Sequence, residues 1–254
     1  MVPKISLFLF LIQSNLVFNV WAAPSEKCSQ TEADFDECAS RMSVFDRDDA
    51  IIPTNDAELD EFCKLALDSL KCARSYARRC MSEFPKTVYG IYQYDVKREI
   101  KKRCQSKEGR EEYMKHMKCG KEKGLAQQRK CIHNFDAQLE WIFMNIPKEQ
   151  QVLVTCCAIH YVHRCIVNET SKLCDSVTGP TTAGYFDKTI GASISEGVDY
   201  SCGKYKSYDD CATHLDPKIW QNMVAIGEDP AKINFKPKNK SPITTIVKIY
   251  SQFS

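Results

Sequence analysis

Apolar residues recur at intervals of three or four along most of the chain, which is the spacing of one face of an α-helix. The first such segment covers residues 28–45. Residues 46–55 then combine a proline with several charged or polar side chains, so we expect a loop there. A long helix follows and runs toward Cys80. Cys63 and Cys72 project from opposite sides of this helix at about 100° per residue, which predicts that it lies centrally, with neighbours on two sides.

The same spacing predicts further helices almost to residue 200, and the alternation of a β-strand is nearly absent. We therefore predict an all-α fold, a disulfide-stapled bundle of about six to seven helices. The later helices are expected over residues 88–103, over 111–118 with a stop near Gly120, over 125–146, from Pro147 to just before Cys174, and from Pro180 through Val198.

The chain changes character after Cys211. No cysteine follows this position, residues 235–242 are rich in proline and lysine, and residues 243–250 are rich in β-branched side chains. This composition predicts a loosely held C-terminal tail over residues 221–254. The disulfide-rich helical domain is expected over residues 23–220.

The N-terminal residues indicate export. A lysine precedes two apolar runs, over residues 5–12 and 16–21, and small residues follow, which is typical of a signal peptide. We expect residues 1–22 to be removed by cleavage after Ala22. A membrane anchor is disfavoured, because the polar residues 13–15 interrupt a segment that is shorter than the ~20 apolar residues needed to span a bilayer.

All fourteen cysteines follow the predicted cleavage site, and an even number of cysteines in an exported chain indicates seven disulfides. The paired Cys-x-x-Cys spacing of a zinc site is missing from the sequence. Asn168, followed by Glu169 and Thr170, is a predicted site of N-glycosylation. The expected product is a secreted, extracellular glycoprotein. Its predicted disulfide cysteines are Cys28, Cys38, Cys63, Cys72, Cys80, Cys104, Cys119, Cys131, Cys156, Cys157, Cys165, Cys174, Cys202 and Cys211.

The apolar seams of the first two helices also predict one disulfide pairing. In an antiparallel hairpin with its loop centred near residue 51, Cys38 and Cys63 lie at nearly the same height, since a helix rises ~1.5 Å per residue. The next level would pair Cys28 with Cys72, but Cys63 and Cys72 point in opposite directions. We therefore predict a bond between Cys38 and Cys63.

A formal net charge of +2 hides an uneven distribution of charge. Residues 26–61 hold twelve acids and three bases, whereas residues 64–131 hold nineteen bases and eight acids. We expect the acidic first helix to neutralise the basic segment inside the fold, and the alternative is an anionic partner on an exposed basic face. The run Lys101-Lys102-Arg103 is expected to be a solvated helix face, with a processing site as the alternative.

One cysteine- and histidine-rich stretch carries candidate chemistry. Residues 156–160, Cys-Cys-Ala-Ile-His, resemble the start of the active-site helix of secreted phospholipases A2. In that family the histidine activates water and the following aspartate holds calcium. Here Tyr161 stands in the position of that aspartate, and no glycine-rich calcium loop precedes the helix. His160 is therefore expected to be structural.

A metal site is the second candidate for the same stretch. Cys156, His160 and His163 share one helix face at steps of four and three. A metal would require Cys156 as a free thiolate, which would leave an odd number of cysteines in an oxidising compartment. We therefore expect no catalytic residue, no metal ligand and no cofactor.

The cysteines between residues 61 and 175 and their neighbours form a distinct layout, which consists of Phe62-Cys63-Lys64, Lys71-Cys72, Arg79-Cys80-Met81, Lys118-Cys119, Lys130-Cys131, Cys156-Cys157, Cys165 and Cys174-Asp175. This layout resembles a group of arthropod secreted, cysteine-rich helical proteins of uncharacterised function, broadly like insect haemolymph glycoproteins. The resemblance covers nearly half of the chain and rests mainly on cysteine spacing. It implies a soluble, extracellular helical fold, and it implies no reaction.

These observations favour a non-enzymatic function. A stapled helical bundle can enclose an apolar pocket, so the leading hypothesis is a secreted binding or carrier protein for a small hydrophobic ligand such as a lipid. The alternative is an extracellular protein-interaction factor, such as a venom component, inhibitor or signalling partner, recognised through basic residues 97–130. A degenerate phospholipase A2-like enzyme is the third hypothesis. We expect no nucleic-acid partner and no transmembrane segment.

Overall fold

The computed structural model describes residues 28–47, 49–234 and 238–253, and every regular element in this part of the chain is a helix. The all-α prediction is confirmed, although ten α-helices and one 3₁₀ helix exceed the expected six to seven. The predicted signal peptide, residues 1–22, lies outside the described residues. None of the helices described has both the length and the apolar character required to cross a bilayer. The elements are α1 (Glu32–Ser40), α2 (Asp56–Cys80), α3 (Glu83–Gln105), α4 (Lys107–Lys123), α5 (Ala126–Asn145), α6 (Lys148–Thr178), α7 (Thr181–Ser201), α8 (Tyr208–His214), α9 (Pro217–Glu228), the 3₁₀ helix η1 (Pro230–Ile233) and α10 (Pro242–Ser251).

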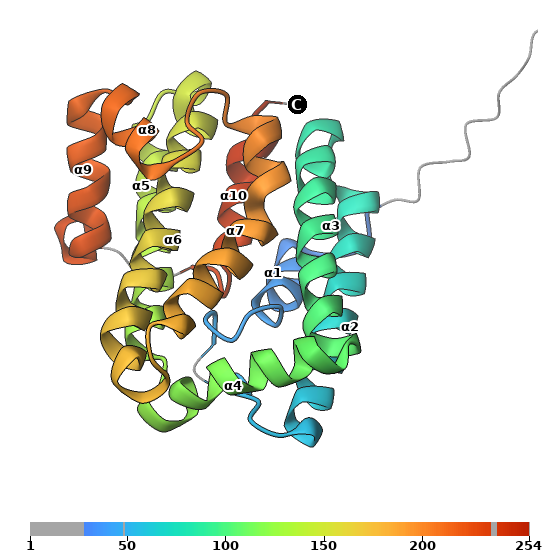
Figure 1. The fold of residues 1–254 in the computed structure, drawn as a ribbon. Helices are drawn as coiled ribbons and strands as arrows, with labels where there is room; N and C mark the ends of the chain where they lie inside the picture. The colour runs from blue at the N-terminus through green and yellow to red at the C-terminus, as the bar shows by residue number, and fades with distance from the viewer. Residues whose placement is uncertain (1–27, 48, 235–237, 254) are drawn as a thin grey trace, which may run out of the picture.

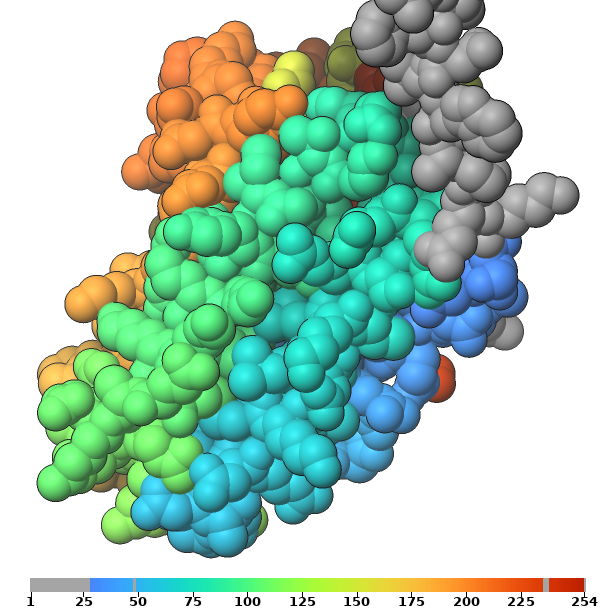
Figure 2. All heavy atoms as spheres, turned by 90° about the vertical axis from the view of Figure 1, so that its right-hand side faces the viewer, coloured from blue at the N-terminus to red at the C-terminus, as the bar shows by residue number. Residues whose placement is uncertain are grey.

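Five helices form a closed ring (Figure 1). α3 packs against α7, α7 against α6, α6 against α5, α5 against α10, and α10 again against α3. α2 is the antiparallel partner of α3, and α1 packs against α2 and α10. α4 runs across the lower end of the molecule in Figure 1 and contacts α2, α3 and α6. Seen from the side, α2, α3 and α4 together cover one face of the protein (Figure 2).

α3 is longer than the apolar pattern predicts. The expected helix covered residues 88–103, whereas α3 begins at Glu83. Pro85 does not break the chain, because it lies in the first turn, where its missing N–H removes no intrahelical hydrogen bond. Proline therefore belongs to the start of this helix.

α4 is also longer than the expected helix over residues 111–118. Gly120 lies inside it, and the helix ends only at Gly124, whose φ of 79° is in the region that favours glycine. Gly120 does not end the helix, and its lack of a side chain leaves room for Leu125 to pack on α4. A Cβ atom there would lie 2.8 Å from Cδ2 of Leu125, so only glycine allows this buried side chain to pack so closely on α4.

Seven disulfides join all fourteen cysteines, so no cysteine among those the structure describes is free. The disulfide framework predicted from the sequence is confirmed. The bonds fall into two groups that do not cross. One group links α1, α2 and α3 through Cys28–Cys80, Cys38–Cys72 and Cys63–Cys104. The other links α4 to α8 through Cys119–Cys174, Cys131–Cys165, Cys156–Cys202 and Cys157–Cys211.

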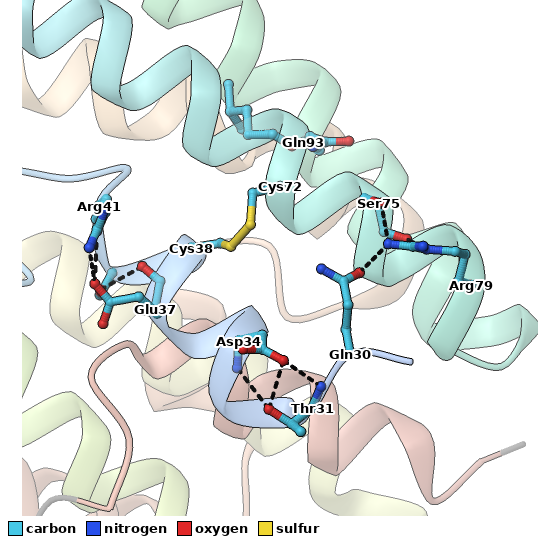
Figure 3. The surroundings of a disulfide bond; sticks show 12 residues. Gln30, Thr31, Asp34, Glu37, Cys38, Arg41, Cys72, Ser75, Arg79 and Gln93 are labelled. Atoms are coloured by element: carbon cyan, nitrogen blue, oxygen red, sulfur yellow. Dashed lines mark hydrogen bonds and ion pairs between the residues drawn. A yellow bond between two sulfur atoms is a disulfide. The ribbon is translucent and has the colours of Figure 1, made fainter. Parts of the chain in front are cut away.

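The predicted bond between Cys38 and Cys63 is wrong. Cys38 of α1 is bonded to Cys72 of α2 (Figure 3), and Cys63 is bonded to Cys104 at the end of α3. The prediction assumed a tight loop, whereas residues 41–55 turn back into the core and bury several apolar side chains. The first half of α2 therefore extends beyond the end of α1. The residue of α2 that lies beside Cys38 is therefore Cys72 and not Cys63. The two positions are nine residues, or about 13 Å, apart along the helix.

The prediction that α2 has neighbours on two sides is confirmed by the same cysteines. Cys72 faces α1 and Cys63 faces α3, as the angle between them requires. The segment before α1 is held against α2 as well. The Arg79 guanidinium donates hydrogen bonds to Gln30 Oε1 and to Ser75 Oγ, each at 2.7 Å (Figure 3).

The expectation of a loosely held tail over residues 221–254 is also wrong. α9 packs against α5 and α6, and α10 is a member of the central ring. Ile249 has no exposed surface, and Tyr250 is 3% exposed. The last helix is therefore part of the hydrophobic core.

Hydrogen bonds fix the start of α10 against α1. The carboxylate of Asp36, a buried residue of α1, accepts hydrogen bonds from the backbone amides of Lys240 and Ser241 and from the Thr244 hydroxyl, at 2.6, 3.0 and 2.7 Å. The β-branched composition concealed this helix, because such residues have a lower helix propensity. The signal that predicts it is the pair Ser241-Pro242, an N-cap followed by proline at the first helical position.

The acidic first helix does not neutralise the basic segment, and only some of the bases of that segment pair with acids elsewhere. Arg110 of α4 pairs with Asp56 and Asp60 at the start of α2, with N–O distances of 2.7 and 2.8 Å. The acids of α1 turn instead toward the C-terminal lysines, and Glu32 lies 2.5 Å from Lys248. These pairs lie at the surface, where each contributes at most about 1 kcal/mol.

Replacing both Cys38 and Cys72 by serine should lower the free energy of unfolding by about 3–4 kcal/mol, because their bond constrains an unfolded loop with a sequence separation of 34 residues. Denaturant titration of the variant and the wild type measures this difference. Peptide mapping without reduction should recover a fragment that joins Cys38 to Cys72. A fragment joining Cys38 to Cys63 would contradict the structure.

Replacing Ile249 by alanine should lower the free energy of unfolding by about 2–4 kcal/mol, because its side chain is fully buried in the core. Ser251→Ala changes an exposed position of the same helix and is the control, with an expected change below about 0.5 kcal/mol. Thermal or denaturant unfolding gives both values. Equally small effects of the two substitutions would show that α10 is not a core helix.

Candidate ligand-binding cavity

The helical ring encloses an apolar cavity with a volume of about 260 Å³. Every helix of the ring contributes to its lining, together with the segment that follows α1. Protein interiors contain few voids larger than a water molecule, so a cavity of this size is a distinct feature of the fold. Its aliphatic and aromatic lining includes Met42, Val44, Phe45, Phe62, Val88, Tyr89, Tyr92, Val96, Tyr113, Ile132, Phe135, Ile159, Val162, Ile166, Phe186, Ile190, Ile194, Val198, Ile243, Ile246, Val247 and Tyr250.

Among the five helices of the ring, α7 has the smallest share of buried residues. Only four of its 21 described residues are buried, and the cavity-lining Ile190 and Ile194 are half-buried. A Cβ atom at Gly184 or Gly197 would meet no heavy atom within 4 Å, so packing does not require glycine at either position. Each glycine nevertheless lowers helix propensity by about 1 kcal/mol relative to alanine. α7 therefore has the least intrinsic support among the cavity walls.

A cationic residue and a tyrosine meet at one place on the cavity lining. The Cζ atom of Arg103 on α3 lies 5.3 Å from the centre of the Tyr113 ring on α4. Tyr113 is 1% exposed and packs on Phe62, with 5.7 Å between ring centres. Among the described residues, the Tyr113 hydroxyl has no hydrogen-bond acceptor, and Arg103 Nε has no hydrogen-bond partner. Burial raises the pKa of Tyr113 to about 12, and the positive charge of Arg103 and its polar contact with the Tyr113 hydroxyl oppose that rise.

A carboxyl group occupies a different level of the same lining. Asp46 accepts a hydrogen bond from Ser241 Oγ at 3.1 Å. Burial raises the pKa of Asp46 to about 7, and hydrogen bonds from Ser241 and Ser43 oppose the rise. The charge of Asp46 adds to the effect of burial in raising the pKa of Tyr92 on α3. Tyr92 and Arg103 are eleven residues apart on that helix, which separates them by about 16 Å along its axis.

The two histidines singled out in the sequence line a separate hollow of about 490 Å³ at the surface of α6. His160 Nε2 donates to the carbonyl oxygen of Tyr205 at 3.2 Å, and burial lowers the pKa of this histidine. His163 Nε2 lies 3.0 Å from a carboxylate oxygen of Asp187. His163 also reaches the apolar cavity, whereas His160 does not. The geometry gives His160 a hydrogen bond that joins α6 to the segment after α7.

The metal hypothesis for Cys156, His160 and His163 is overturned by the disulfides. Cys156 is bonded to Cys202, so it cannot supply a thiolate ligand. Within the described residues, no group of three or more His, Cys, Asp or Glu side chains is arranged to hold a metal ion. Asn168 is exposed on α6, and its glycosylation stays a prediction.

Arg103 and Tyr113 were not identified as candidate site residues from the sequence. Arg103 ends the run Lys101-Lys102-Arg103, for which a solvated face was expected, and the two lysines are indeed exposed. Arg103 is only half-exposed, because it follows Ile100 by three residues and continues a buried seam. The detectable signal was therefore a basic residue at an apolar position of the helical repeat.

Comparisons with protein-family models, with curated proteins and with solved structures found no match for this chain. The resemblance to arthropod secreted proteins therefore stays a prediction.

Replacing Asp46 by asparagine should stabilise the protein at alkaline pH. The pKa of about 7 in the folded state lies above the ordinary value of 3.8, so the folded protein holds a proton that the unfolded chain releases. The resulting stabilisation is present at low pH and is lost as the pH rises through 7. Asparagine stays neutral at any pH, so the variant should exceed the wild type in free energy of unfolding by about 2–4 kcal/mol above pH ~8.

Denaturant titrations at pH 5 and pH 8.5 measure this difference for Asp46→Asn and the wild type. The advantage of the variant should be larger at pH 8.5 than at pH 5 by about 2–3 kcal/mol, because the folded wild type loses its proton only near pH 7. Destabilisation of the variant by the same amount at both pH values would contradict a neutral, buried Asp46.

Proposed function

We propose that the protein is a secreted, non-enzymatic carrier that encloses a small hydrophobic molecule in the cavity between α3, α5, α6, α7 and α10. The observation that carries this proposal is the cavity of about 260 Å³ and its apolar lining. At about 24 cal/mol per Å³, an empty cavity of that volume costs on the order of 6 kcal/mol. This cost is comparable with the entire stability of a typical domain. An apolar ligand would recover the missing contacts.

The disulfides support the extracellular part of the proposal. Cross-linking of all fourteen cysteines is typical of an oxidising compartment. The lining favours binding, because aliphatic and aromatic side chains supply most of its contact area. A carrier needs these two properties, which are persistence outside the cell and an apolar interior.

The dimensions of the cavity limit the ligand. A dry cavity of about 150 Å³ accommodates benzene, so by proportion about 260 Å³ accommodates on the order of ten non-hydrogen atoms. The proposed ligand is therefore a small lipid-like molecule rather than a large sterol or a phospholipid.

An extracellular interaction factor with an anionic partner is the second candidate. Lys101, Lys102, Lys107, Lys115 and Lys118 are exposed on α3 and α4, and the structure shows no ion pair for them within the described residues. Retention on heparin at physiological salt would favour this candidate, because screening weakens scattered surface charges.

Replacing Val162 by phenylalanine should reduce the affinity for naphthalene, a neutral fluorescent hydrocarbon, by at least about tenfold, because the larger side chain fills part of the cavity. The free energy of unfolding should stay the same or rise, since a void is filled. Fluorescence titration measures binding. Leu65→Phe, at a half-exposed position outside the cavity, is the matched control and should bind as the wild type does. A wild-type protein that binds neither naphthalene nor decanol would overturn the carrier function.

A further inference from the structure

We propose that the cavity is built for an anionic amphiphile, a single aliphatic chain that ends in a carboxylate, and that Arg103 and Tyr113 bind this carboxylate. The inference rests on the proposed carrier function and names the chemical class of its ligand. It follows from the place on the largely apolar lining where a cation, Arg103, lies beside a buried tyrosine whose hydroxyl has no acceptor. The Tyr89 hydroxyl on the same lining also has no hydrogen-bond partner among the described residues, but the structure shows no cation of the lining beside it.

Tyr113 places a buried hydroxyl group at the cavity lining. Its side chain is 99% buried, and among the described residues its hydroxyl donates a hydrogen bond to no acceptor, while Arg103, a donor only, lies close to it. A buried polar group without a partner destabilises a protein by about 1–3 kcal/mol, so phenylalanine would serve this position better if packing were the only requirement. A hydroxyl directed at the cavity is explained by a ligand atom that accepts its proton in a hydrogen bond.

Arg103 determines the charge of that ligand atom. The guanidinium lies against the Tyr113 ring, and its Nε has no hydrogen-bond partner within the part of the chain that the structure describes. Glu99, one turn earlier on α3, lies 3.6 Å from Arg98 and forms no ion pair with Arg103. A guanidinium without a protein carboxylate, beside an unpaired hydroxyl, matches a ligand carboxylate, which can accept hydrogen bonds from both groups.

The rest of the lining determines the orientation of the ligand. Asp46 is the other charged residue that lines the cavity, and it repels an anion at its own level, near Tyr92. The carboxylate is therefore placed at the Arg103 level, about 16 Å away along α3. Between these levels the lining is aliphatic and aromatic, which suits a hydrocarbon chain. Decanoate has the required chemistry and about the size that the volume allows.

Isothermal titration calorimetry at pH 8 with decanoate, decanol and protonated decylamine tests the assignment. These probes share one chain and differ in the charge of the head group. The wild type should bind decanoate at least about tenfold more tightly than decanol, whereas the affinity for decylamine, whose ammonium group suits the Asp46 level instead, should not fall in Arg103→Gln or Tyr113→Phe. Arg103→Gln and Tyr113→Phe should each weaken decanoate binding by about tenfold and change decanol affinity by less than about threefold. Tyr113→Phe removes only an unpaired hydroxyl, so it should fold at least as well as the wild type and keeps the test valid if Arg103→Gln is unstable.

The outcomes separate this inference from the carrier function. Decanol binding without a preference for decanoate, or a preference that survives both substitutions, would overturn the assignment of Arg103 and Tyr113 and leave the carrier function standing. Failure of all three probes and of naphthalene would overturn both proposals together. A preference for decanoate that each of the two substitutions abolishes would support both the carrier function and the assignment of Arg103 and Tyr113.

Discussion

The covalent cross-links are the constraint on which the rest of the structure depends. Each disulfide contributes roughly 2–4 kcal/mol by restricting the unfolded chain, and seven of them are available to offset a cavity that costs on the order of 6 kcal/mol when empty. A bundle of this length without cross-links would gain stability by collapsing its centre. The cross-linked bundle can keep its helices apart and still be stable. This separation leaves room for an internal binding site.

The helices themselves could be predicted from the sequence, because apolar periodicity is a local property. The long seam of α2 and the seam of α5 were recognised at nearly their true positions. The pairing of Cys38 could not be derived in this way, since the matching level on α2 depends on the path of residues 41–55. That path depends on the space between distant helices. Short-range patterns contain no information about this space.

The lining of the cavity could not be predicted from the sequence for a related reason. A valine or an isoleucine that faces an empty volume has the same neighbours in sequence as one that faces another side chain, so Val162 and Ile194 look like ordinary core positions. The polar residues are different, because Arg103 at an apolar position of α3 is a local anomaly. Such anomalies mark places where the usual rule of burial is broken, and function is one reason to break it.

The two groups of disulfides do not cross, and this arrangement has a mechanical consequence. Residues 28–104 form one cross-linked body and residues 119–211 form another, while the cavity has lining from both. α3 of the first body and α7 of the second are joined by side-chain packing, by the ion pair of Arg98 with Glu196, and by a hydrogen bond from the Glu196 amide to the Asp95 carboxylate. Separation of the two bodies along the α3–α7 interface would therefore break these non-covalent contacts but none of the seven disulfides.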